Sequence, residues 1–136
     1  MAISRRVVAP LLVSAMVLAM QGPSAGAPDI LRVGHRFKVH PHVTTADYDG
    51  NRHNIEGRVG LRNTADRGRN VRCRVVATLE DQDGTATKKG DDFFRTHVGP
   101  NTTKRIPFDI EIRDDPHRFQ NDPSRVAGHC HTPYRN

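Results

Sequence analysis

The stretch VRCRVVATL, residues 71–79, decides the fold class, because its apolar residues recur at every second position. Val71, Cys73 and Val75 share one parity with the alanine and leucine that follow, whereas Arg72 and Arg74 have the other parity. Successive side chains of a β-strand point to opposite faces of its sheet. The alternation therefore predicts a strand that buries one face and exposes the other.

Two more stretches alternate in the same way and are expected to supply the rest of the core. Residues 55–61 place Ile55 and Leu61 on the apolar side, and residues 106–112 place Phe108 there. Pro107 lacks a backbone N–H donor, so the strand that contains it is expected at a sheet edge or at a bulge. Weaker strand candidates are residues 36–44, 85–88, 92–98 and 125–131.

Turn-forming residues separate these candidates. They are Asp49-Gly50, Asp66-Arg67-Gly68, Asp83-Gly84 and Gly99-Pro100-Asn101. Residues 114–124 are polar and contain proline, which predicts a loop before the last strand. No stretch after residue 26 has the apolar spacing of an amphipathic helix. We therefore expect an all-β fold, an antiparallel immunoglobulin-like β-sandwich of six or seven strands.

The N-terminal 26 residues are typical of an export signal. Residues 1–6 are basic, residues 7–20 form an apolar run and residues 21–27 are mostly small, which is the order found in signal peptides. The run is shorter than the roughly 20 residues that span a bilayer, so no permanent membrane span is expected in the mature chain. We expect a signal peptide over residues 1–26, one domain over residues 27–136, and a secreted or cell-envelope protein. Two questions stay open: whether cleavage follows residue 26 or residue 27, and whether export uses the general or the twin-arginine pathway.

Two cysteines in an exported chain of 136 residues favour a single disulfide, Cys73 to Cys130. Such a bond would fix the C-terminal strand to the core. The alternative is a pair of free thiols that act as ligands or as a nucleophile, which an oxidising compartment disfavours.

The charge balance is basic but dispersed. Lys and Arg number 21 against 15 Asp and Glu; without residues 1–26 the count is 19 against 15, a net charge of +4. The chain has neither a basic run nor the stacking aromatics of a nucleic-acid interface, so no nucleic acid is expected as a partner.

Four arginines share the outward parity of two predicted strands and would form a binding patch if those strands pair: Arg58, Arg62, Arg72 and Arg74. Its partner would be an acidic protein or an anionic surface polymer; the alternative is an ordinary solvated sheet face.

Histidine pairs provide a second candidate site. His40 and His42 are two residues apart, as are His129 and His131, so on strands each pair would point to one face. Imidazole nitrogens bind Zn or Cu, and two pairs brought together could supply four ligands. The alternative is that these histidines are solvated at strand ends, with no cofactor.

Catalytic motifs are not found in the sequence. Ser124 is the single serine beyond the signal peptide, and it lies in the predicted loop without a nucleophile elbow. The sequence also has no His-Glu-x-x-His motif and no glycine-rich phosphate loop. We expect a non-enzyme: an exported binding or cell-surface interaction module or, alternatively, an exported Zn- or Cu-binding protein.

The order of strands and turns over residues 55–112 resembles the FxLYD family. The resemblance rests on residues 55–63, on residues 71–84 with their Asp-Gly turn, and on the Gly99-Pro100 turn before the strand that holds Phe108. It implies a small immunoglobulin-like sandwich on an exported bacterial protein. It implies no catalytic residue and no binding site.

Overall fold

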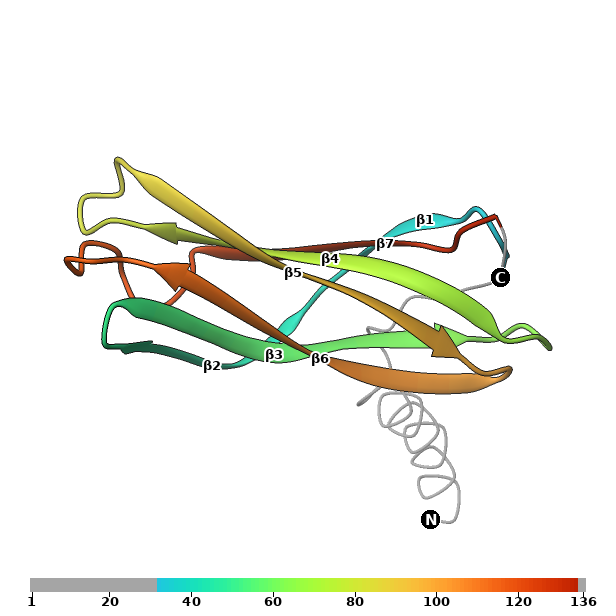
Figure 1. The fold of residues 1–136 in the computed structure, drawn as a ribbon. Coiled ribbons are helices and arrows are strands. Elements are labelled where there is room, and N and C mark those ends of the chain that lie inside the picture. Colours follow the sequence, from blue (N-terminus) through green and yellow to red (C-terminus); the bar gives the residue numbers. More distant parts are fainter. Residues whose placement is uncertain (1–31, 135–136) are drawn as a thin grey trace, which may run out of the picture.

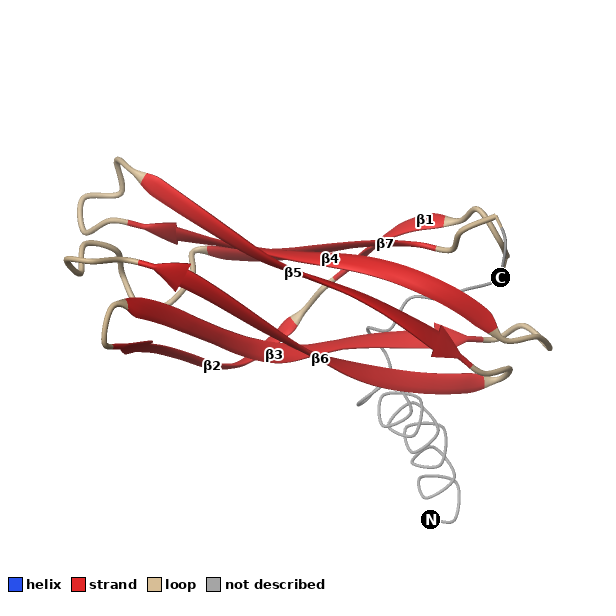
Figure 2. Ribbon diagram, in the orientation of Figure 1, coloured by secondary structure: helices blue, strands red, loops and turns tan. Residues whose placement is uncertain are grey.

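The computed structural model describes residues 32–134, which form two antiparallel sheets packed face to face (Figure 1). Within this range all regular structure is β-strand (Figure 2). The strands are β1 (Arg36–Val39), β2 (His42–Asp49), β3 (Arg52–Asn63), β4 (Arg69–Glu80), β5 (Thr87–Val98), β6 (Thr102–Arg113) and β7 (Arg125–His131). The predicted signal peptide, residues 1–26, lies outside the described residues.

The strand order confirms the predicted β-sandwich. One sheet has four strands in the order β1-β7-β4-β5, and the other has three in the order β2-β3-β6. We call them the four-stranded and the three-stranded sheet. β6 lies at an edge of the three-stranded sheet, which confirms the position predicted from Pro107.

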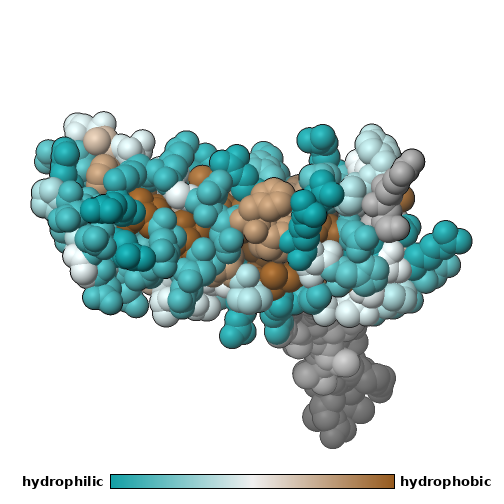
Figure 3. All heavy atoms as spheres, viewed as in Figure 1, coloured by the Kyte–Doolittle hydropathy of each residue, from teal (hydrophilic) through white to brown (hydrophobic). Residues whose placement is uncertain are grey.

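The core lies between the sheets and comes from the alternating stretches. On β4, Val71, Cys73, Val75 and two further apolar side chains are almost fully buried, and Ile55 and Leu61 of β3 face them. Each buried Val, Ile or Leu side chain contributes roughly 1.5–3 kcal/mol by leaving water. The view of Figure 3 shows mainly hydrophilic residues, interrupted by brown and tan residues along the middle of the molecule.

Two of the weaker strand predictions were wrong in their boundaries. The stretch 36–44, predicted as one strand, is split at Pro41 into β1 of the four-stranded sheet and β2 of the three-stranded sheet. Proline has no N–H for a ladder, so the chain changes sheets there. The stretches 85–88 and 92–98, predicted as two strands, form the single strand β5, whose partner β4 pairs with it along its whole length.

A glycine permits the close approach of β2 to β3. The register between these strands shifts between Val43 and Thr45, opposite Gly57. A Cβ atom placed on Gly57 would lie 2.1 Å from the backbone oxygen of His42, far inside van der Waals contact. Only glycine fits this position without moving the β2 backbone.

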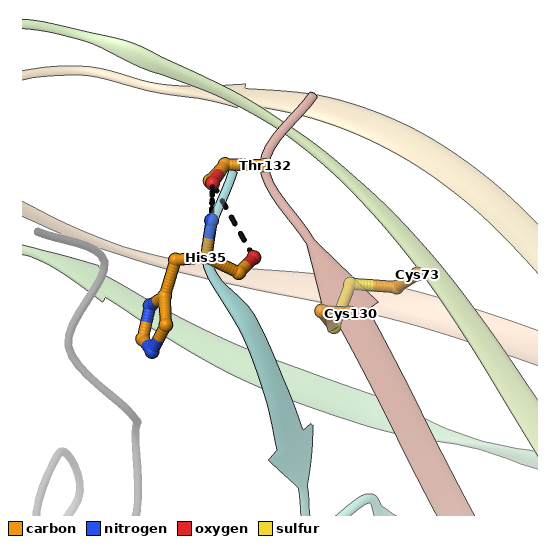
Figure 4. Close-up of a disulfide and its surroundings, with 4 residues drawn as sticks. All are labelled: His35, Cys73, Cys130 and Thr132. Atoms are coloured by element: carbon orange, nitrogen blue, oxygen red, sulfur yellow. Dashed lines mark hydrogen bonds between the residues drawn. A yellow bond between two sulfur atoms is a disulfide. The ribbon is translucent and has the colours of Figure 1, made fainter. Parts of the chain in front are cut away.

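The predicted disulfide, Cys73–Cys130, is present and joins β4 to β7. The two residues are direct partners in the ladder, with Cα atoms 4.1 Å apart. The bond therefore lies within the four-stranded sheet, whereas the bond of antibody domains bridges the two sheets. Figure 4 shows the neighbouring link between β7 and β1, where the backbone N–H of His35 donates to the Thr132 hydroxyl over 2.9 Å.

Residues 32–134 contain no helix long and apolar enough to cross a membrane.

Candidate functional site

The predicted arginine patch does not form. It required the strands of Arg58 and Arg72 to pair, but β3 pairs with β2 and β6 while β4 pairs with β5 and β7. Arg58 and Arg62 therefore lie on the outward side of the three-stranded sheet, and Arg72 and Arg74 lie on the outward side of the other. Strand parity was predicted correctly, but the assignment of strands to one sheet was wrong.

A different basic surface covers the outward side of the four-stranded sheet, which we call the outer basic face. One row across the four strands runs Arg36, His131, Arg72, Arg95. The next row runs Lys38, His129, Arg74, Phe93. His129 and His131 share this face on either side of the buried Cys130, as the i, i+2 spacing predicted.

The two outward sides of the sandwich differ in charge. The outer basic face carries seven cationic residues against two acidic ones, a difference of +5. These residues are Arg36, Lys38, Arg72, Arg74, Lys89, Arg95 and Arg125 against Glu80 and Asp91. The outward side of the three-stranded sheet carries five of each sign, a difference of zero. These are Arg52, Arg58, Arg62, Arg105 and Arg113 against Asp47, Asp49, Glu56, Asp109 and Glu111.

Among residues 32–134, ion pairing within the outer basic face neutralises little of its positive charge. Arg74 Nε donates to Asp91 Oδ2 over 2.8 Å, and both side chains are exposed, by 60% and 49%. Exposed pairs of this kind are weak because water screens them. On the opposite side, Arg52 Nη1 donates to Glu111 Oε2 over 3.0 Å, again between exposed side chains.

The outer basic face is uneven and has an aromatic residue within it. Phe93 is 57% exposed, next to Arg74 in the ladder. One hollow, of about 400 Å³, is lined by residues of β1 and β7 that include Arg36, Lys38 and His131. Another, of about 370 Å³, lies between Arg72 and its neighbours on β4 and β5. The hollows are shallow and open, so they suit an extended ligand better than an enclosed small molecule.

The four predicted metal-ligating histidines do not gather at one site, although His40 and His129 line the same hollow of about 270 Å³. His42 pairs with Arg58 on the three-stranded sheet, while His129 pairs with Lys38 and Arg74 on the other. His40 lies in the segment that connects the two sheets. The two pairs therefore do not form one four-histidine site.

Another group of possible metal ligands lies at the end of the sandwich where β2 turns into β3, the left end in Figure 1. It consists of His53, Asp114 and His117, which we call the histidine–aspartate cluster. Their ligand atoms lie within 4.8 Å of one another, and within residues 32–134 this is the single group of three or more His, Cys, Asp or Glu side chains so arranged. His53 and Asp114 are buried, and His117 is exposed.

Asp114 is the centre of this cluster. Its Oδ2 lies 2.7 Å from His53 Nε2 and accepts the backbone N–H of Phe119 over 2.9 Å; the N–H of Arg118 reaches both carboxylate oxygens. Burial alone would raise the pKa of Asp114, but the hydrogen bonds from His53, Phe119 and Arg118 lower it below its ordinary value. The carboxylate is thus held ionised in a fixed orientation.

Tyr48 holds the exposed member of the cluster. Its ring stacks on His117 with centroids 3.8 Å apart, and its hydroxyl donates to the backbone oxygen of Asp114 over 2.6 Å. Burial, followed by the carboxylates of Asp114 and Asp115, raises the pKa of Tyr48. The phenol therefore stays protonated and keeps donating.

Sequence patterns do not predict this cluster, because Asp114 and His117 lie 61 and 64 residues after His53 along the chain. One feature of the sequence does point to it: His53 has the same inward parity as Ile55 and Leu61, which predicts a buried imidazole ring. A buried imidazole requires a partner.

Comparison with family models, with curated proteins and with solved structures finds no match to this chain. The FxLYD resemblance stays a prediction from sequence.

Proposed function

We propose that this protein is an exported, non-catalytic binding module whose outer basic face binds a linear anionic polymer of a cell surface. The observation that carries the proposal is the charge difference between the two sides of the sandwich. The positive charge is concentrated on one side although the whole chain is only mildly basic. A surface of one sign attracts a partner of the other sign and orients it.

The spacing of the cations supports a polymer as the ligand. Neighbouring strands are about 4.8 Å apart, and residues two apart on a strand are separated by about 6.6 Å. Arg72 and Arg95 therefore lie one strand spacing apart, and Arg36 lies two spacings from Arg72 in the same row, with His131 between them. Guanidinium groups bind carboxylates and phosphates through paired hydrogen bonds, and a polymer with one anion per repeat offers such groups in series.

Phe93 supports a contact surface in the same place. Its ring is more than half exposed and so presents apolar surface to water. Aromatic residues and arginine are both enriched in protein interfaces. Here the ring borders Arg74 at the edge strand β5. It would pack against the apolar backbone of a bound polymer between its charged groups.

Two triple variants with the same charge change test the proposal. The first replaces Arg36, Lys38 and Arg95 with serine on the outer basic face. The matched control replaces Arg58, Arg105 and Arg113 with serine on the other side. All six residues are exposed, so both variants should fold, which thermal unfolding checks.

Binding to polyphosphate and to poly-glutamate, measured by calorimetry at fixed salt, separates phosphate from carboxylate recognition. We expect the first variant to lose at least about tenfold in affinity for the bound polymer, since each cation near an anionic surface contributes about 1 kcal/mol. The control should stay within about twofold of the parent. Equal losses in the two variants, or no binding of either polymer, would contradict the proposal.

A further inference from the structure

We propose that the histidine–aspartate cluster binds one divalent metal ion of the Zn²⁺ type through the two imidazoles of His53 and His117 and the carboxylate of Asp114. A fourth position would be open to water on the exposed side of His117. The inference is independent of the outer basic face, because the cluster lies at the end of the sandwich on other residues.

The donor set fits this class of ion. Two imidazole nitrogens and one carboxylate oxygen, with water as a fourth ligand, form a common coordination of Zn²⁺. Imidazole also binds Cu²⁺ and Ni²⁺, whereas Ca²⁺ and Mg²⁺ prefer all-oxygen sites. Ligand atoms around a tetrahedral Zn²⁺ are about 3.3 Å apart at bond lengths of about 2.0–2.1 Å. The largest separation here, within 4.8 Å, closes by a small movement of His117, which is exposed and lies in a loop.

The surrounding hydrogen bonds orient the donors in the way that metal sites require. Ligating carboxylates are usually fixed by hydrogen bonds of their own. Asp114 receives backbone N–H groups from Arg118 and Phe119. Its own N–H donates to the backbone oxygen of Asn51 over 2.8 Å, which ties the loop to the turn between β2 and β3. His117 is positioned by the ring of Tyr48.

His53 can offer its Nε2 to a metal ion. In the metal-free protein Nε2 donates a hydrogen bond to Asp114 Oδ2 over 2.7 Å, and Nδ1 is buried without a hydrogen-bond partner. A metal ion that replaces the proton between Nε2 and Oδ2 would be bound by both atoms, and the proton of the neutral ring would then lie on Nδ1.

The test is a titration of EDTA-treated protein with Zn²⁺ by calorimetry, with Co²⁺ as a spectroscopic probe of coordination. His117→Ala removes one ligand from the exposed side, so it should not prevent folding. The matched control is the double variant His129→Ala, His131→Ala, which removes two histidines from the outer basic face. We expect one ion per chain in the parent and in the control, with at least about tenfold weaker binding in His117→Ala.

The spectrum of bound Co²⁺ should show the visible bands of a four-coordinate ion in the parent and lose them in His117→Ala. Three results would overturn the proposal: no binding to the parent, equal binding in His117→Ala, or binding lost in the control. The last would place the metal on the outer basic face. A cluster that serves only to hold the loop would give the first result.

Discussion

Replacement of Asp114 by alanine tests how the end of the sandwich is held together in the metal-free protein. The side chain is 2% exposed and accepts hydrogen bonds from His53 Nε2 and from the backbone N–H of Phe119, which are both buried. A buried donor that loses its acceptor costs about 1–3 kcal/mol. Two such donors give an expected loss of about 2–6 kcal/mol in the free energy of unfolding.

Urea unfolding at neutral pH, followed by far-UV circular dichroism with EDTA present, measures this loss. Asp122→Ala is the matched control, because Asp122 is an exposed acid in the same loop. Asp114→Asn should lie between the two, since an amide oxygen still accepts a hydrogen bond but carries no charge. A loss for Asp114→Ala within about 1 kcal/mol of the control would refute the view that this carboxylate satisfies the buried donors.

Three further predictions concern stability. Replacing Cys73 and Cys130 with alanine should cost up to about 4 kcal/mol from the loop of sequence separation 57; amide exchange should accelerate in β1 and β7, and unchanged exchange there would count against the assigned role. Gly57→Ala should destabilise by about 1–3 kcal/mol, because the new methyl group meets the β2 backbone; Gly99→Ala, where the nearest atom lies at 3.5 Å, is the control for thermal unfolding. The pKa of Asp114 is lower in the fold than its ordinary 3.8. The stabilisation from its carboxylate is therefore present above pH 3.8 and is lost as the pH falls through the depressed pKa. On acid titration, the Asp114→Asn variant should lose stability less steeply than the parent below about pH 4.

The sequence predicted the strands of the core well because burial imposes a strict period of two. The stretches around Ile55, Cys73 and Phe108 each alternate between one packed and one solvated side, and all three are central strands or paired edges in the structure. The disulfide was predicted from the presence of two cysteines and from the oxidising compartment expected for an exported chain. β5 was harder to predict, because its middle carries Gly90, Asp91 and Asp92, which interrupt the apolar pattern.

The candidate sites depend on which strands are neighbours, and alternation alone does not determine this. Parity placed Arg72 and Arg74 outward correctly, but it did not show which strands flank theirs, and so it did not place Arg36 and Arg95 on the same face. Likewise, His53 meets Asp114 only because β3 pairs with β6 over its full length. Long-range pairing is decided by the packing of the whole sandwich, which no local stretch encodes.

A map of backbone amide shifts on titration with polyphosphate and with poly-glutamate shows whether the charge asymmetry of the sandwich makes the outer basic face a binding surface. If the outer basic face binds the polymer, the shifts should concentrate on β1, β7, β4 and β5, with the largest near His129 and His131, and they should diminish as salt is raised. Shifts of equal size on β2, β3 and β6, or none with either polymer, would contradict the assignment of this face as the binding surface.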